Sequence, residues 1–433
     1  MVNLPGDKSI SHRAAILAAI ADGESHIENY LVSGVTDAML QSLSALGVVW
    51  ELRGSTLIVQ GKGLEGIVPP PSPLNCGNSA TTLRLLVGLI SAAGVPAILD
   101  GSPGLRKRPM KRIVDPLRAM GVDIKAEEGH TAPLKIGPRS KSRALKGISY
   151  TLPIASAQVK SCILLAGLAA DSPVTIIEPG PSRDHTERMF TSLGIEVVTS
   201  AGNKTSRNIC LYPQLPLRIP PLKITVPGDF SSAAFLIVAA LLSPGSDIRI
   251  LNVGLNPTRT GLLDVLLSMG AQIQVGNLRT SHGEILGDLI IHNSELVSTI
   301  VSGSLVVRMI DEFPVLGVAA GIAKGVTIVS DASELRYKES DRISAMCREL
   351  RMLGIDIEEK SDGFVVYGNN RIFGGQVDSH NDHRLAMSLT LAGLIAENPV
   401  IVHNSEVIAE SFPEFIPTMQ NLGANLEEDI ELA

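Results

Sequence analysis

The stretch LPGDKSISHRAA, Leu4–Ala15, decides the interpretation of the fold because it occurs twice. A partial copy, VPGDFSSAAF, begins at Val226. In both copies a Pro-Gly turn and an Asp precede Ser and a long apolar run. This pattern predicts a capped N-terminus followed by a buried helix. The 433 residues therefore divide into two similar halves.

Each half contains three shorter repeats. A Gly that ends an amphipathic helix and precedes a strand recurs roughly every 75 residues. These glycines are Gly47, Gly121, Gly194, Gly270, Gly354 and Gly423. Ala-rich apolar helices without a polar face alternate with the amphipathic ones, and we expect them to be buried on all sides. They begin near Ser11, Ser79, Ala157, Ser231, Glu312 and Asn381. A repeat is thus predicted to run strand, buried helix, strand, amphipathic helix, strand, strand.

The two PGD turns mark the predicted domain boundaries. We expect one domain over residues 7–226 and a second over residues 227–433 that also includes residues 1–6, each with three repeats. The sixth repeat ends at Ala433 without its last strand. A segment from the N-terminus is the candidate to complete it, although only Met1–Leu4 precede the first turn.

Composition narrows the class of protein. Hydrophobic residues make up 45% of the chain and charged residues 19%, as in a globular protein. The formal net charge of -7 argues against a nucleic-acid partner, and the apolar runs are too short to span a membrane. Four scattered cysteines without a CxxC spacing, and a chain that opens directly into the PGDKS turn, indicate a cytoplasmic protein. We expect it to be a monomer with small-molecule substrates.

Polar and charged side chains gather where the buried helices begin. Helix N-termini attract anions through their free N–H groups and their dipole. Ordinary capping explains any one of these starts. Five starts also carry Lys, Arg, Gln or an acid, which favours an anion site in a cleft between the two domains. The residues at these starts include Lys8, Ser9, Arg13, Asn78, Ser156, Gln158, Asp311, Glu312, Asp382 and Arg384.

Two carboxylates stand among these cations. In YKESDR, Tyr337–Arg342, Glu339 lies between Lys338 and Arg342, and Asp311 precedes the apolar helix FPVLGVAAG. Such carboxylates can move protons while the cations hold an anionic substrate. A salt-bridged helix and a simple cap are the alternatives. A third group of residues could suggest a metal site, and it comprises His380, Asp382 and His383. No further ligand follows at metal spacing, so we expect a site without metal.

With these motifs in place, the chain resembles the enolpyruvyl transferase family over essentially its whole length. The resemblance is carried, in the family's order, by PGDKSISHRA, GNSATTLR, KRPM, SAQVKS, SRDHTE, IDEFP, LRYKESDR and NDHRLAM. GDKS, SAQVK and RDHTE together resemble the class II branch that acts on shikimate 3-phosphate. The resemblance implies an α/β fold with mixed parallel and antiparallel sheets. It further implies two similar domains, each an inside-out α/β barrel of three βαβαββ repeats, with the active site in the cleft between them.

The resemblance also implies a reaction and roles. The enolpyruvyl group of phosphoenolpyruvate is transferred to the 5-hydroxyl of shikimate 3-phosphate by addition and elimination, with no metal or organic cofactor. The implied catalytic residues are Asp311, which resembles the proton acceptor, Glu339, which resembles the proton donor, and Lys8, which touches both substrates. The residues implied to bind shikimate 3-phosphate are Lys8, Ser9, Arg13, Ser156, Ala157, Gln158, Ser182, Arg183, Asp311 and Lys338. Those implied to bind phosphoenolpyruvate are Lys8, Asn78, Ala80, Arg108, Gln158, Arg342 and Arg384.

Departures from the family pattern leave alternatives open. Position 80 is Ala where many members have Gly, and Glu410 stands where many have a Lys that contacts phosphoenolpyruvate. Transfer to UDP-N-acetylglucosamine is the first alternative, but that branch uses a Cys in a loop where GSPGLRKRPM, Gly101–Met110, has none. A binder of phosphorylated ligands without catalysis is the second. The presence of both Asp311 and Glu339 argues against it.

Overall fold

The computed structural model describes residues 1–140, 143–203, 205–368 and 371–428. The chain forms two compact units. The N-terminal unit comprises Pro5–Pro227 and Arg279–Leu286, and the C-terminal unit comprises Met1–Leu4, Gly228–Leu278 and Gly287–Ala433. The chain crosses between units beside both PGD turns. Three details differ from the expected boundaries: residues 5–6, residue 227 and residues 279–286 belong to the N-terminal unit.

The sheets of the N-terminal unit share one strand order. The orders are β13-β2-β4-β3, β5-β6-β8-β7 and β9-β10-β12-β11. In each sheet the first two strands of this order are parallel, and the other neighbouring pairs are antiparallel. Its strands are β2 (Asp22–Glu28), β3 (Val49–Arg53), β4 (Thr56–Lys62), β5 (Leu74–Asn75), β6 (Ala97–Asp100), β7 (Ile124–Ala126), β8 (Leu134–Ile136), β9 (Ser149–Thr151), β10 (Val174–Glu178), β11 (Val197–Ala201), β12 (Arg207–Leu211) and β13 (Lys223–Thr225). Its helices are α1 (Lys8–Ala19), α2 (Gly34–Ala45), α3 (Ala80–Ala93), α4 (Pro103–Arg106), α5 (Lys111–Ala119), α6 (Ala157–Gly167), α7 (His185–Ser192) and the 3-10 turn η1 (Leu64–Gly66).

The C-terminal unit repeats the same order in the sheets β1-β14-β16-β15 and β17-β18-β20-β19, while β21 and β22 pair as two strands among the described residues. Its strands are β1 (Val2–Asn3), β14 (Asp247–Gly254), β15 (Gln272–Ser281), β16 (Glu284–His292), β17 (Ile300–Val301), β18 (Gly325–Val329), β19 (Asp356–Lys360), β20 (Gly363–Gly368), β21 (Gly375–Asp378) and β22 (Val400–His403). Its helices are α8 (Phe230–Leu242), α9 (Gly261–Ser268), α10 (Ser304–Arg308), α11 (Phe313–Ile322), α12 (Arg342–Met352), α13 (His383–Gly393), α14 (Phe415–Asn421), η2 (Ser333–Tyr337) and η3 (Ser405–Glu410).

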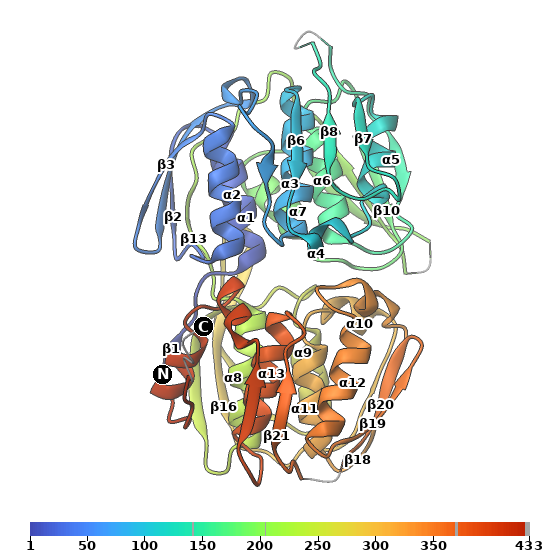
Figure 1. Ribbon diagram of the computed structural model, residues 1–433. Helices are drawn as coiled ribbons and strands as arrows, with labels where there is room; N and C mark the ends of the chain where they lie inside the picture. The colour runs from blue at the N-terminus through green and yellow to red at the C-terminus, as the bar shows by residue number, and fades with distance from the viewer. Residues whose placement is uncertain (141–142, 204, 369–370, 429–433) are drawn as a thin grey trace. The chain divides into compact units, whose positions relative to one another are not determined.

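The predicted buried helices form the interior of each unit. Helices α1, α3 and α6 contact one another in the N-terminal unit, as do α8, α11 and α13 in the C-terminal unit. Every residue of α8 is buried. In Figure 1, β2, β3 and β13 lie along one side of α1 and α2, so these strands cover helices rather than another sheet. The mixed α/β class is confirmed.

Local signals in the chain account for the helix ends. The Asp of each PGD turn caps the next helix: Asp7 Oδ1 accepts a hydrogen bond from the Ile10 N–H at 2.9 Å, and Asp229 Oδ1 accepts one from the Ser231 N–H at 2.7 Å. The six repeat glycines follow α2, α5, α7, α9, α12 and α14 with φ between +80° and +100°. This left-handed conformation favours glycine, so the predicted helix ends are confirmed.

The strands that precede the two PGD turns are exchanged between the units. β13 pairs in parallel with β2, whereas β1 pairs in parallel with β14. The expectation that the N-terminal segment completes the sixth repeat is therefore wrong, because this segment supplies the first strand of the fourth. The two turns meet at this point, where the Asp7 N–H donates to the Pro227 carbonyl at 2.8 Å.

Close packing of α3 on α6 gives a stability prediction. A Cβ at Gly88 would lie 2.5 Å from the Cys162 carbonyl oxygen, so Gly88→Ala forces the helices apart. We expect a loss of about 1–3 kcal/mol in the free energy of unfolding, measured by chemical denaturation. Gly34→Ala is the matched control, because a Cβ there meets nothing within 4 Å. Equal stability of the two variants would contradict this packing.

Candidate active site

In the N-terminal unit, the first turn of α1 is held by Arg13. Its side chain is buried, with 4% of the residue exposed. The guanidinium donates to the Ser9 carbonyl at 2.9 Å, to Ser161 Oγ at 2.7 Å and to Thr186 Oγ1 at 2.7 Å. Burial lowers the pKa of Arg13 to about 10, against the opposing effect of Glu187, so it remains a cation at neutral pH. Arg13 thus ties the half-buried end of α1, where Lys8 and Ser9 lie, to α6 and α7.

His12 joins the starts of α1 and α3. Its Nδ1 lies 2.7 Å from the Lys8 carbonyl and its Nε2 lies 3.0 Å from Thr82 Oγ1. A carbonyl can only accept, so Nδ1 carries the proton that is shared with the Lys8 carbonyl. Burial, together with the nearby charges of Lys8 and Arg13, lowers the pKa of His12 to about 4. A neutral histidine therefore couples two helix starts that both carry predicted anion ligands.

The starts of α3 and α6 meet through Gln158. Its amide donates to Thr81 Oγ1 at 2.8 Å and accepts from Arg84 at 2.5 Å. Arg84 also donates to the Pro109 carbonyl at 3.0 Å, next to the buried Arg108. Five predicted ligands thus fall on neighbouring segments: Asn78, Ala80, Arg108, Ala157 and Gln158.

The segment between β10 and α7 carries two further predicted ligands. Ser182 is buried, and its hydroxyl donates to Glu178 Oε2 at 2.7 Å. Arg183 is half-buried and precedes α7. Ser156 is the N-cap residue of α6, and its side chain makes no capping hydrogen bond. The N-terminal unit therefore presents cations and neutral donors beside the starts of α1, α3 and α6.

In the C-terminal unit, Arg342 organises the predicted catalytic carboxylates. Its residue is 2% exposed, and its guanidinium donates to carboxylates on three segments. These contacts are Nη1 to Asp311 Oδ1 at 3.1 Å, Nη2 to Glu339 Oε2 at 2.6 Å, and Nε to Asp382 Oδ2 at 2.7 Å. Burial opposes the charge, but the three carboxylates outweigh it and raise the pKa of Arg342. Burial likewise opposes the charge of Asp382, whose pKa is nonetheless lowered by Arg342.

Arg384 extends this cluster to the start of α11. Its guanidinium lies 3.7 Å from Asp311 Oδ2 and 3.9 Å from Glu312 Oε1. Glu312 is buried and accepts a hydrogen bond from the Ser231 hydroxyl at the start of α8. The structure thus brings Asp311, Glu339, Arg342 and Arg384 together in one unit. Lys338 lies next to Glu339, half-buried, at the end of η2.

Comparison with known proteins identifies the family of this chain. A model of the family EPSP synthase (3-phosphoshikimate 1-carboxyvinyltransferase) matches residues 1–419. The chain belongs to the EPSP synthase family. A 3-phosphoshikimate 1-carboxyvinyltransferase of Petrotoga mobilis is 45% identical over 97% of this chain and 96% of its own, and one of Geobacter metallireducens is 44% identical over 98% and 96%.

Solved structures agree with this membership. An EPSP synthase from Acinetobacter baumannii superposes with a TM-score of 0.86 at 41% identity, covering 98% of this chain and 96% of that one. The enolpyruvyl transferase NikO from Streptomyces tendae has a TM-score of 0.78 at 20% identity, over 98% and 94%, which shows a shared fold only.

Several polar contacts in this EPSP synthase relative escaped the interpretation of the sequence. Lys160 lies inside α6 and contacts Glu178 and Glu187, and it was not among the residues singled out in SAQVKS. Its signal was a Lys within an otherwise apolar helix. Asp382 belongs to a group weighed as a metal site, yet it caps α13 and binds Arg342. His380 of that group pairs with Glu349 at 2.7 Å.

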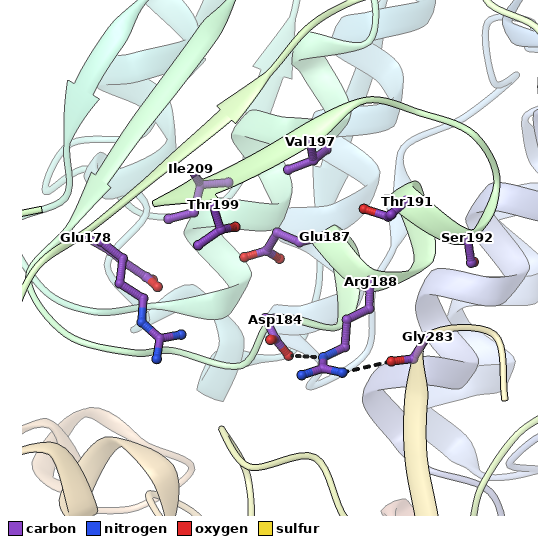
Figure 2. A pocket seen from close by; sticks show the side chains of 11 residues that line it. Glu178, Asp184, Glu187, Arg188, Thr191, Ser192, Val197, Thr199, Ile209 and Gly283 are labelled. Carbon is purple, nitrogen blue, oxygen red and sulfur yellow. Dashed lines mark hydrogen bonds and ion pairs between the residues drawn. The ribbon is translucent and has the colours of Figure 1, made fainter. Parts of the chain in front are cut away.

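One cavity is lined by none of the predicted substrate ligands, although Glu178 and Asp184, next to Ser182 and Arg183, line it. It has a volume of about 480 Å³ and is lined by α7, β11, β12 and Gly283. Figure 2 shows the Arg188 guanidinium between the Asp184 carboxylate and the Gly283 carbonyl, with hydrogen bonds of 2.7 and 2.8 Å. The Glu187 side chain also lines it. No predicted substrate ligand does, so this cavity is not the predicted active site.

Among the described residues, no helix is both long and apolar enough to cross a membrane. No group of three or more His, Cys, Asp or Glu suited to a metal ion occurs among them either. Glu410, the departure noted at a position often occupied by Lys, ends η3 half-buried.

The buried His12 predicts an acid-sensitive N-terminal unit. Its pKa is lowered from 6.5 to about 4. Between these pH values His12 is protonated in the unfolded chain but not in the folded chain, so acid favours unfolding. Relative to His12→Gln, the wild type should lose about 3 kcal/mol of unfolding free energy between pH 6.5 and 4. Urea denaturation of both proteins across this range measures the difference. The exposed His403→Gln is the control, and a wild-type curve parallel to that of His12→Gln would show that His12 titrates normally.

Proposed function

We propose that residues of both units act on one pair of substrates. As a member of the EPSP synthase family, the chain transfers the enolpyruvyl group of phosphoenolpyruvate to shikimate 3-phosphate in the shikimate pathway of aromatic amino-acid biosynthesis. The finer part of the proposal concerns the acceptor hydroxyl, the residues and their roles. It includes the 5-hydroxyl as acceptor and an active site in the cleft between two domains. It also includes inside-out α/β barrels as the architecture of those domains.

The observation that carries the roles is the Arg342 cluster. A guanidinium that donates to Asp311, Glu339 and Asp382 is built for carboxylate and phosphate oxygens. Phosphoenolpyruvate offers both kinds of oxygen, and we assign it to Arg342 and Arg384. When its oxygens replace those of Asp311 and Glu339 on Arg342, the two side chains become available for proton transfer. Asp382, fully buried and also the cap of α13, stays in place and keeps Arg342 oriented.

Proton transfer then follows the two halves of an addition and elimination. In the addition, Glu339 gives a proton to the methylene carbon, the 5-hydroxyl oxygen bonds to the central carbon, and Asp311 takes the hydroxyl proton. In the elimination, the Glu339 carboxylate takes a proton from the new methyl group, the C–O bond to phosphate breaks, the double bond is restored, and the departing phosphate takes the proton held by Asp311. Closure of the domains would exclude water during these steps.

The N-terminal unit supplies the cations for shikimate 3-phosphate in this proposal. Lys8 and Ser9 lie at the start of α1, and Arg183 lies on the loop before α7. Ser156, Ala157 and Gln158 add the positive end of α6. The remaining proposed ligands are Arg13, Ser182 and, from the C-terminal unit, Lys338 and Asp311. The free cysteines Cys76, Cys162, Cys210 and Cys347 fit the proposed cytoplasmic monomer.

Phosphate release tests the function directly. The purified chain is given phosphoenolpyruvate with either shikimate 3-phosphate or UDP-N-acetylglucosamine, and free phosphate is measured. Release with shikimate 3-phosphate is the expected result. Release with the UDP-sugar alone would refute the acceptor, and no release with either would favour a binder without catalysis.

Two substitutions test the proposed roles. Asp311→Ala and Glu339→Gln should each lower kcat by at least about 100-fold, because each removes a group that moves a proton. The affinity for shikimate 3-phosphate should stay within about tenfold, since binding rests mainly on cations of the N-terminal unit. Steady-state kinetics and calorimetry measure the two quantities. Glu334→Gln, on η2 of the same unit, is the control. A near-normal kcat in either test variant would exclude its residue from proton transfer.

A further inference from the structure

We propose that Lys160 is a positioning residue for the shikimate 3-phosphate site, a role that rests on the proposed function. It makes no substrate contact in this proposal. It fixes the segment that carries Ser182 and Arg183 against α6, whose first turn carries Ser156–Gln158.

Lys160 is buried within the N-terminal unit. The residue has 0% exposure and lies one turn after the start of α6. Its Nζ lies 3.1 Å from Glu178 Oε2 and 2.7 Å from Glu187 Oε1. It also donates to the Ser182 carbonyl at 3.5 Å. One ammonium thus reaches the end of β10, the following loop and the first turn of α7.

The acceptors of Lys160 bracket the ligand-bearing loop. Glu178 is the last residue of β10 and Glu187 is the third residue of α7. Lys160 therefore holds the chain on both sides of residues 179–184. Ser182 is attached a second time, because its hydroxyl donates to Glu178 at 2.7 Å. Glu187 Oε2 has no hydrogen-bond partner in the described part of the chain, so its carboxylate depends on Lys160 for its position.

A second set of hydrogen bonds connects α6 and α7 to α1. Next to Lys160, Ser161 Oγ lies 2.7 Å from Thr186 Oγ1, and Arg13 donates to both hydroxyls. The side chains of Lys160 and Arg13 bring two positive charges, which Glu178 and Glu187 balance. The proposed ligands on α1, α6 and the 179–184 loop are therefore held in one neutral, buried network.

Electrostatics acts in opposite senses on two members of this network: burial raises the pKa of Glu178 against the opposing effect of Lys160, whereas the ammonium of Lys160 is held in its charged form. Burial alone would lower the pKa of Lys160, but Glu187 and Glu178 outweigh it and raise that pKa. Buried ion pairs contribute little net stability compared with apolar residues of similar volume. Three charges at this place therefore gain more from their fixed geometry than from stability, as a positioning role requires.

The test separates positioning from stability. Lys160→Met keeps the length of the side chain and removes the ammonium. Calorimetry with shikimate 3-phosphate alone should show at least about tenfold weaker binding. At saturating shikimate 3-phosphate, kcat and the KM for phosphoenolpyruvate should stay within about threefold, because neither depends on the 179–184 loop.

A second variant and a control keep the test decisive if Lys160→Met folds poorly. Glu187→Gln retains the shape of the network and loses one charge, and we expect about threefold weaker binding of shikimate 3-phosphate. Lys324→Met is the control, since Lys324 pairs with the exposed Glu295 in the C-terminal unit. Folded variants with unchanged affinity, or with kcat and both substrate constants shifted together, would overturn the proposal. Loss of phosphate release in the wild type would instead refute the proposed function.

Discussion

The fold depends on the burial of whole helices. Because α8 is buried over its whole length, as α11 is along most of its length, the polar residues of α8 stand at its start, as Ser231 and Ser232. The free N–H groups there need acceptors, and the dipole favours negative charge. Chemistry in this protein is therefore concentrated at helix starts. The same need for acceptors explains why Asp7 and Asp229 are the N-cap residues of α1 and α8, although the residues that follow them differ.

Charge at these ends is balanced internally before any substrate is considered. Arg342 at the start of α12 opposes the helix dipole, and carboxylates from three segments compensate it. Lys160 in α6 is compensated by two glutamates. The first cluster contains proposed catalytic groups that an anion can displace. The second contains no proposed catalytic group, which is why we assign chemistry to the first and the maintenance of shape to the second.

Much of the fold was predictable because its signals are local. The repeat glycines and the caps act within a few residues, so Gly47 or Asp7 could be interpreted without knowing the tertiary structure. Strand exchange was not predictable in this way, since Val2 carries no mark of its partner Ile250. The family motifs named the proposed ligands, but Lys160 was missed because its partners lie on other elements.

The exchange of β1 and β13 separates the order of synthesis from the order of assembly. When β13 leaves the ribosome, its partner β2 is already made, so that sheet can close at once. β1 is made before β2, yet it must wait for β14. A strand that is made early thus belongs to a sheet that is completed late.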